Sequence, residues 1–253
     1  MTMLQPSIDI NLNATIWRME IDELTDTLVA EVRDEQQKQA SFSAINLVTG
    51  KLNFTGHTTP ERWLTGVECV YDNVVLLHHY KHETGPEHKA VIAIAADSAN
   101  ELWSNYSIAF DHLSINGPVV YSTAFQSKKL MLADIKTGAL VRPYDELQDK
   151  PFPNSIVIPN ITTADHFAPG VLPYQAYGNI VHYLNHNNYI IVSLHTQKTG
   201  GLQQHLLIMD GTNIVYQDIL NADIQKLQPE AFVLHKNALV YIKNKVEIKA
   251  LNL

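Results

Sequence analysis

Short apolar runs, each introduced by a turn residue, recur along this chain. The turn residue tolerates a left-handed backbone, and the aliphatic or β-branched residues after it are typical of a buried strand. The five copies begin at Asp26, Asn73, Gly117, Asn188 and Asn237, at spacings of 47, 44, 71 and 49 residues. Recurrence at a near-constant period predicts structural repeats.

A second pattern follows about 20 residues after the first and consists of an apolar strand, a polar turn and another strand. It is clearest at residues 45–52 and 132–140, with looser copies at 94–103 and 208–216. Gly or Asn in these turns supplies the positive φ that a tight hairpin needs. The alternation of both patterns predicts an all-β chain.

The turn sequences carry a family resemblance. Residues 134–140, with Asp134, Thr137 and Gly138, and residues 101–103 resemble the D-x-x-T-G-x-x-x-W hairpin of quinoprotein-type and YVTN-type β-propeller repeats. In those repeats the hairpin joins the third and outermost strands of a blade. The whole chain is also similar in length and pattern to an uncharacterised, mainly Bacteroidetes family with a domain of unknown function. This resemblance implies a bacterial protein and assigns it no activity.

We therefore predict a five-bladed β-propeller, because units of about 50 residues suit four-stranded blades. The fold is expected to be one domain that spans residues 1–253. The second and third strands of successive blades are predicted at 28–32 and 41–47, 74–79 and 89–96, 119–124 and 129–134, 189–195 and 204–209, and 238–242 and 246–252.

The last residues suggest how the ring closes. Residues 250–253 repeat residues 44–47, but the chain has no residues left for the strand that follows the earlier copy. Residues 14–17 resemble residues 100–103, so we assign them as the missing outer strand. Pairing the N-terminal strand with the C-terminal blade would close the ring and remove two exposed sheet edges.

Two other architectures remain open. A β-sandwich would explain the strands but not their regular spacing. A sixth, degenerate blade could lie within residues 145–180, inside the longest gap between repeats.

An insertion at residues 145–177 accounts for that gap. It contains Pro151, Pro153, Pro159, Pro169 and Pro173, five of the 11 prolines in the chain. Because proline removes a donor from a β-ladder, we expect a long ordered loop rather than a central strand. By the predicted strand order, this loop lies on the face where propellers usually bind ligands.

Other predicted connections on the same face carry histidine, aromatic and acidic side chains. Functional residues concentrate on loops that a rigid scaffold holds in place. The candidate ligand-binding residues are Trp63, His82, His88, Asp111, His112, Asp165, His166, Phe167 and Tyr174.

A histidine-rich segment precedes the predicted strand at 89–96. His82, Glu83 and His88 have the donor chemistry of a divalent metal site and could converge on a loop. His78 and His82 would lie about 13 Å apart on a continuous strand, too far to share an ion. We expect no resident metal, and these three residues are the candidates if one is present.

Catalytic motifs are sparse. Paired carboxylates would support glycoside hydrolysis, but the inner-strand acids Glu20, Asp22, Glu68, Asp111 and Glu230 form no recognisable motif. The Gly-x-Ser-x-Gly elbow and the phosphate-binding glycine loop are absent. The stacked tryptophan and vicinal cysteines of quinone-dependent propellers are absent as well, so no cofactor is predicted.

Composition narrows the class of protein. Of the 253 residues 45% are hydrophobic and 17% charged, which indicates a packed core, and the net charge of −8 disfavours nucleic-acid binding.

Cys69, the single cysteine, lies in an apolar stretch and predicts a buried thiol without an intramolecular disulfide. With no signal sequence or apolar run of about 20 residues, we expect a cytoplasmic monomer without a membrane span.

The function predicted from these observations is noncatalytic binding of a protein or small ligand on the loop-rich face. The alternative is an enzyme, or a metal site, at the mouth of the central channel.

Overall fold

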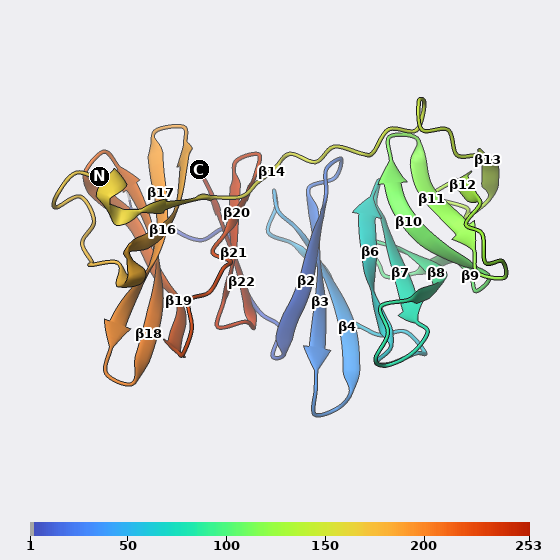
Figure 1. Ribbon diagram of the computed structural model, residues 1–253, viewed down its shortest axis with the longest axis horizontal. Coiled ribbons are helices and arrows are strands. Elements are labelled where there is room, and N and C mark those ends of the chain that lie inside the picture. Colours follow the sequence, from blue (N-terminus) through green and yellow to red (C-terminus); the bar gives the residue numbers. More distant parts are fainter. Residues whose placement is uncertain (1–2) are drawn as a thin grey trace. The chain divides into compact units, whose positions relative to one another are not determined.

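A computed structural model describes residues 3–253, and almost all of its regular structure is antiparallel sheet (Figure 1). The chain divides into two compact units. One comprises residues 14–154, and the other comprises residues 155–253 together with the N-terminal residues up to Asn13. Among the described residues the helical segments are the 3-10 turns η1 (Ala164–His166) and η2 (Tyr177–Asn179). Neither is long or apolar enough to cross a bilayer.

The unit of residues 14–154 contains three four-stranded meanders. In each meander every strand pairs with the one before it in the chain. The sheets are β2 (Thr15–Asp22), β3 (Thr27–Asp34), β4 (Gln39–Asn46) and β5 (Leu52–His57); β6 (Thr65–Tyr71), β7 (Val74–Tyr80), β8 (His88–Ala95) and β9 (Glu101–Asn105); and β10 (Ile108–Ser114), β11 (Gly117–Ser122), β12 (Leu130–Ala133) and β13 (Leu140–Pro143).

Apolar residues on facing sheets hold this unit together. Val29 and Phe42 of the first sheet pack with Val75 and Leu77 of the second in one buried cluster. A further cluster joins the second sheet to the third, and the Trp103 indole donates to the carbonyl of Ile135 at 2.9 Å. The inner strands are therefore buried on both faces, which is why their sequences read as continuous apolar runs rather than alternating ones.

The unit with the C-terminus contains two five-stranded sheets. Their orders are β1-β22-β21-β20-β14 and β15-β16-β17-β18-β19. The strands are β1 (Ile8–Asn11), β14 (Ile156–Val157), β15 (Asn160–Thr163), β16 (Ile180–His186), β17 (Tyr189–Lys198), β18 (Gly201–Asp210), β19 (Asn213–Ile224), β20 (Val233–His235), β21 (Ala238–Lys243) and β22 (Glu247–Asn252).

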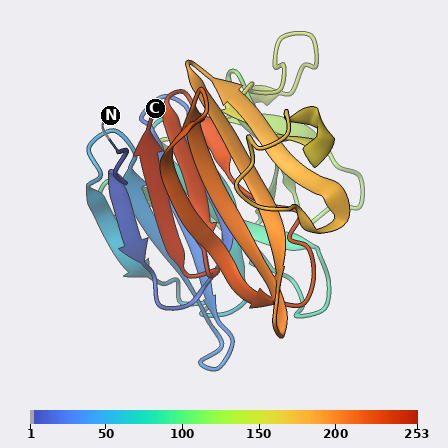
Figure 2. The same ribbon diagram turned by 90° about the vertical axis from the view of Figure 1, so that its left-hand side faces the viewer.

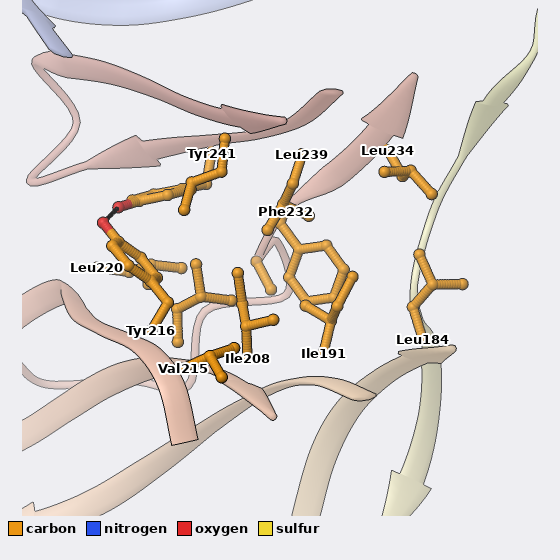
Figure 3. Close-up of a cluster of buried hydrophobic side chains, with 13 residues drawn as sticks. Leu184, Ile191, Ile208, Val215, Tyr216, Leu220, Phe232, Leu234, Leu239 and Tyr241 are labelled. Atoms are coloured by element: carbon orange, nitrogen blue, oxygen red, sulfur yellow. Dashed lines mark hydrogen bonds between the residues drawn. The ribbon is translucent and has the colours of Figure 1, made fainter. Parts of the chain in front are cut away.

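A buried cluster joins these two sheets (Figure 3). Ile191 and Ile208 face Leu239 across the interface, and all three are fully buried. At the edge of the cluster, the hydroxyls of Tyr216 and Tyr241 lie 2.7 Å apart, and Tyr241 donates to Asp218 Oδ2 at 2.7 Å. Because a phenol has one hydrogen to donate, Tyr216 must be the donor to Tyr241.

The opposite face of the β15–β19 sheet is covered by part of the insertion (Figure 2). Phe167, Val171 and Leu172 pack against a buried cluster that includes Val192 and Leu207. Both faces of this sheet are thus shielded from water, one by a neighbouring sheet and one by an irregular segment of chain.

The ten predicted second and third strands are confirmed. Each coincides with one of β3, β4, β7, β8, β11, β12, β17, β18, β21 and β22, within a few residues at either end. The all-β class is likewise confirmed, and five small antiparallel sheets fit a propeller-like arrangement. The expectation that residues 1–253 are one domain stays a prediction.

The predicted position of the N-terminal strand was wrong. Residues 14–17 open β2, which pairs with β3 and not with the C-terminal strand. Instead Ile8 to Asn11 form β1 and pair with β22, where Ile8 lies opposite Ala250. The physical reason is burial. Ile8 is 2% exposed, whereas Trp17 is 63% exposed. Trp103, the residue that Trp17 resembles in sequence, packs against a buried cluster.

The insertion contains two short edge strands. Residues 145–177 include β14 and β15, which add to the edges of β20 and β16 respectively. Because both strands join sheets that other strands build, the described residues 145–180 form no additional blade.

The role of β1 gives a stability test. Ile8→Ala removes a buried side chain and should lower the free energy of unfolding by about 2–4 kcal/mol. Asp9→Ala on the same strand is the control, because the Asp9 side chain is 55% exposed and Lys249 keeps Asp218 as a second partner, so the loss should be less than about 1 kcal/mol. Urea unfolding of both variants measures the difference. Equal effects would mean that β1 does not complete the sheet.

Candidate functional site

Glu68, His78 and His88 come together on the β6–β9 sheet. Oε1 of Glu68 lies 2.7 Å from Nδ1 of His88 and 3.1 Å from Nδ1 of His78. The two imidazole rings are stacked, with centroids 3.6 Å apart and planes 7° from parallel. One donor atom from each residue lies within 4.8 Å of the others, which is the spacing of a possible metal site.

Two β-bulges position these side chains. The β6–β7 register shifts between Val67 and Cys69, which leaves Glu68 as an extra residue in its strand. The β7–β8 register shifts at His78, where Ala90 on the partner strand has φ of 63°. A bulge bends its strand and re-aims the side chains beside it, and bulges are common next to functional sites.

His78 is the most deeply buried member of the cluster. Its side chain is 1% exposed, and neither ring nitrogen has a hydrogen-bond partner, although Nδ1 is within ion-pair distance of Glu68. The ring fits because residue 66 is glycine: a Cβ there would lie 2.8 Å from His78 Cε1. Gly66 thus admits an imidazole whose polar atoms are unsatisfied.

The charges of this cluster follow from its surroundings. Burial opposes ionisation of Glu68, but the hydrogen bond with His88 and the attraction of both imidazoles prevail and lower its pKa to about 2. Burial lowers the pKa of His78, partly opposed by Glu68. At neutral pH the cluster therefore offers a carboxylate and a neutral imidazole.

A buried ion pair supports the cluster from the neighbouring sheet. Arg33 donates to Glu31 Oε1 at 2.7 Å and to the carbonyl of Thr65 at 2.7 Å. Glu31 in turn accepts a 2.9 Å hydrogen bond from the backbone N–H of Val67. These contacts connect β3 to β6 at Thr65 and at Val67, the residue directly before Glu68.

Aromatic rings surround the Arg33 guanidinium. The distance from Arg33 Cζ to the ring centroid is 4.9 Å for Trp63, 5.7 Å for Trp17 and 5.9 Å for Tyr80. Tyr80 also meets the edges of both imidazoles, at 4.5 Å from His78 and 5.0 Å from His88. Of the residues singled out from the sequence, Trp63 and His88 thus belong to this region.

The other two metal candidates lie outside the cluster. His82 and Glu83 are exposed on the turn between β7 and β8. Asp111 and His112 lie on β10 in the same unit, where Asp111 Oδ2 is 2.9 Å from His112 Nδ1 and Lys128 completes a surface group. The structure thus places these four residues in two separate groups, one on the β7–β8 turn and one on β10.

The candidates on the insertion lie in the C-terminal unit. Asp165 accepts a 2.8 Å hydrogen bond from Asn179, and His166 and Phe167 form an aromatic group with Tyr183. Tyr174 lies apart from them and stacks on His205 at 4.5 Å between centroids. That all nine candidates share one rim stays a prediction.

Tyr174 lines a groove of about 910 Å³ between the insertion and strands β17–β19. One wall comes from residues 173–178 and the other from residues of β17, β18 and β19. The lining residues are Pro173, Tyr174, Gln175, Ala176, Tyr177, Gly178, Thr196, Gln197, Lys198, Gln203, His205, Gln217, Asp218 and Ile219.

Side chains in the groove differ in how firmly they are held. Nε2 of His205 lies 2.9 Å from the Thr196 hydroxyl, and Asp218 is bound by Tyr241 and by Lys243, each at 2.7 Å. In contrast, Oε1 of Gln203 is buried without a hydrogen-bond partner. The groove therefore has a rigid frame and one unsatisfied acceptor.

The sequence analysis named Glu68 among the inner-strand acids but did not join it to the histidine-rich segment, because the bulges that position these side chains leave no sequence signal. It missed Gln203 and His205 altogether. Here a signal was present: they are polar residues at alternate positions of an apolar strand, so they share one face of β18.

One family model matches part of the chain, and its description assigns no function. A family model described as a domain of unknown function (DUF4905) matches residues 21–103, less than half of the chain. The matched segment includes Glu68, His78 and His88. No curated protein matches the chain.

Two solved structures are similar over nearly the whole chain. One is Chaetomium thermophilum Raptor, at 9% identity and a TM-score of 0.39, with 99% of this chain and 29% of that chain covered. The other is the Dos1 propeller, at 10% identity and a TM-score of 0.18, with 99% and 76% covered. This chain therefore spans less than a third of the Raptor chain. The fold of this chain is established by the strand pairings of its own five sheets.

Buried histidines also occur on the β15–β19 sheet. His195 is 2% exposed and accepts a 3.1 Å hydrogen bond from the backbone N–H of Gln228. Burial lowers its pKa to about 4, and the charges of His182 and His205 act in the same direction. The folded chain keeps His195 neutral where an unfolded chain would protonate it.

Stability should therefore fall as pH decreases from about 6.5 to about 4, because the unfolded chain binds a proton that the folded chain does not. One such group adds a slope of about 1.4 kcal/mol per pH unit. His195→Gln should reduce the slope of unfolding free energy against pH by about one proton, measured by urea unfolding between about pH 7 and 5. The exposed His82→Gln is the control, and parallel slopes for wild type and His195→Gln would contradict the assignment.

Proposed function

We propose that this protein is a noncatalytic binding protein that holds its ligand in the groove between residues 173–178 and strands β17–β19. The groove itself is the observation that carries the proposal. Ligand sites are concave, largely preformed and lined by a few fixed polar groups. Here His205 is fixed by its contact with Thr196, and the insertion supplies the second wall.

The lining favours a neutral, polyhydroxylated ligand such as an oligosaccharide. The aromatic rings of Tyr174 and Tyr177 remain more than one-third exposed, and their electron-rich faces attract the C–H groups of a sugar ring. The amides of Gln175 and Gln197 can each donate hydrogen bonds to hydroxyl groups and accept hydrogen bonds from them. Lys198 is the one Lys or Arg among the lining residues.

The lining also argues for binding rather than catalysis. Asp218 is the one carboxylate among these residues, and its oxygens accept from Tyr241 and Lys243. Acid–base hydrolysis of a glycoside needs two carboxylates that flank the scissile bond. A single carboxylate committed to structural hydrogen bonds is suited to neither role.

Isothermal titration with cellohexaose, maltohexaose and chitohexaose tests the proposal. At least one of these sugars should bind, and Tyr174→Ala should weaken its binding by about tenfold or more, since one aromatic contact is worth about 1.4 kcal/mol. Tyr106→Ala is the control, because that tyrosine is 62% exposed on the turn after β9, outside the groove lining. The absence of binding by all three sugars, or equal affinities of the two variants, would overturn the proposal.

We also propose that the five sheets are blades of one closed, monomeric propeller of the type that residues 134–140 resemble. Two observations support this architecture. Consecutive four-stranded meanders repeat along the chain, and β1 adds the outermost strand to the sheet of the C-terminal strand. The latter arrangement is a common means of joining the ends of a ring of repeats.

Small-angle X-ray scattering tests closure. A compact monomer of this length should have a radius of gyration of about 18 Å. A value well above this at the mass of a monomer would contradict a closed ring, and a doubled mass would contradict the monomer.

A further inference from the structure

We infer that Glu68, His78 and His88 form a binding site for one divalent transition-metal ion of the Zn²⁺ class. The inference concerns the unit of residues 14–154 and is independent of the groove proposed as the ligand site. It rests on the donor set, on the unsatisfied imidazole of His78 and on the arrangement of the three side chains.

The donor set suits zinc better than the hard cations. Two imidazole nitrogens and one carboxylate oxygen are a known three-residue set for Zn²⁺, which leaves a fourth position for water. Ca²⁺ and Mg²⁺ prefer sites made of oxygen atoms. Cys69 follows Glu68 in sequence, but it packs among Val74 and Leu76 and supplies no thiolate.

The distances are close to those of a ligated ion. Donors bound tetrahedrally at about 2.1 Å from zinc lie about 3.4 Å from one another. Glu68 Oε1 is 2.7 and 3.1 Å from the two Nδ1 atoms. The two distances to Glu68 need to lengthen by less than an ångström to reach this value.

His78 supplies the strongest argument. A buried polar atom without a partner costs about 1–3 kcal/mol, so nearly all core histidines are hydrogen-bonded. Both nitrogens of His78 lack a partner, and its Nδ1 faces a carboxylate oxygen without the alignment of a hydrogen bond. A metal ion coordinated by an imidazole nitrogen of His78 and by Glu68 Oε1 would satisfy both atoms at once.

The stacked rings define how an ion must enter. An ion bound to an imidazole lies in the plane of that ring, and two nearly parallel planes 3.6 Å apart share no such point. One ring must therefore turn. His88 is free to do so, because its side chain is 26% exposed and it follows the exposed turn after β7, whereas His78 is 1% exposed and is held against Gly66. Binding should open the stack by rotation of His88.

Cobalt titration of the full chain, freed of metal by EDTA and desalting, tests this site. One Co²⁺ per chain should bind and produce the visible d–d absorption of a four-coordinate ion, without a thiolate charge-transfer band. His88→Gln and Glu68→Gln should each weaken binding by at least about tenfold, since even the loss of an outer-shell partner costs about 10–100-fold. Zn²⁺ should displace the cobalt.

The adjacent turn offers matched controls. His82→Gln and Glu83→Gln change the same residue types at exposed positions nearby and should leave cobalt affinity within about twofold of wild type. His88→Gln is the principal variant because that side chain is partly exposed, so the variant should fold, as circular dichroism will verify. Tyr174→Ala should also bind cobalt normally, which separates this test from that of the groove.

Histidine ring NMR gives a second readout. On addition of Zn²⁺, the Nδ1 resonances of His78 and His88 should shift while those of His82 stay in place. Absence of a one-to-one cobalt complex overturns the inference. Wild-type affinity in His88→Gln and Glu68→Gln overturns it as well, because the ion would then be held by other surface histidines.

Discussion

The buried ion pair of Arg33 and Glu31 determines where the candidate metal site lies. The pair is enclosed between two sheets, and its remaining hydrogen-bonding groups reach the backbone of β6 at Thr65 and Val67. A buried charge is tolerated only where its partners are complete, so these contacts restrict β6 to one position against β3. Glu68 follows Val67 directly, and its place beside His78 and His88 depends on that restriction.

The same logic applies to the C-terminal unit. There a hydrogen-bonded series from Tyr216 through Tyr241 to Asp218 closes one edge of the apolar core between two sheets. Asp218 also belongs to the groove, so the wall of the groove is rigid because the core behind it is. On the other wall, the insertion is fixed by packing of Phe167 and its neighbours on the β15–β19 sheet. In each unit, a candidate site borders on polar groups that sheet packing holds in place.

Prediction from the sequence succeeded where the signal was local. Turn residues such as Asn73 and Asn188 precede buried runs, and the ten strands after and between them are where the pattern placed them. It failed for residues 14–17, since a likeness of a few residues to another outer strand carries no information about the pairing partner. Ile8 is buried and Trp17 is exposed, so burial selected residues 8–11 as the strand that pairs with β22. His88 was identified as a candidate ligand, but its partners were assigned to the adjacent turn instead of to neighbouring strands.

The sequence by itself determined the ten strands that follow the repeated turns, the repeat and the position of the insertion, because turn chemistry and apolar runs act over a few residues. Tertiary structure decided which edge the N-terminal strand joins, which wall of the groove the insertion forms, and that Glu68, His78 and His88 meet. Those outcomes depend on β-bulges and on the glycine at position 66, whose effects appear only when strands pair. A one-residue change of register turns a side chain to the other face of a sheet, and register is a property of paired strands rather than of any one of them.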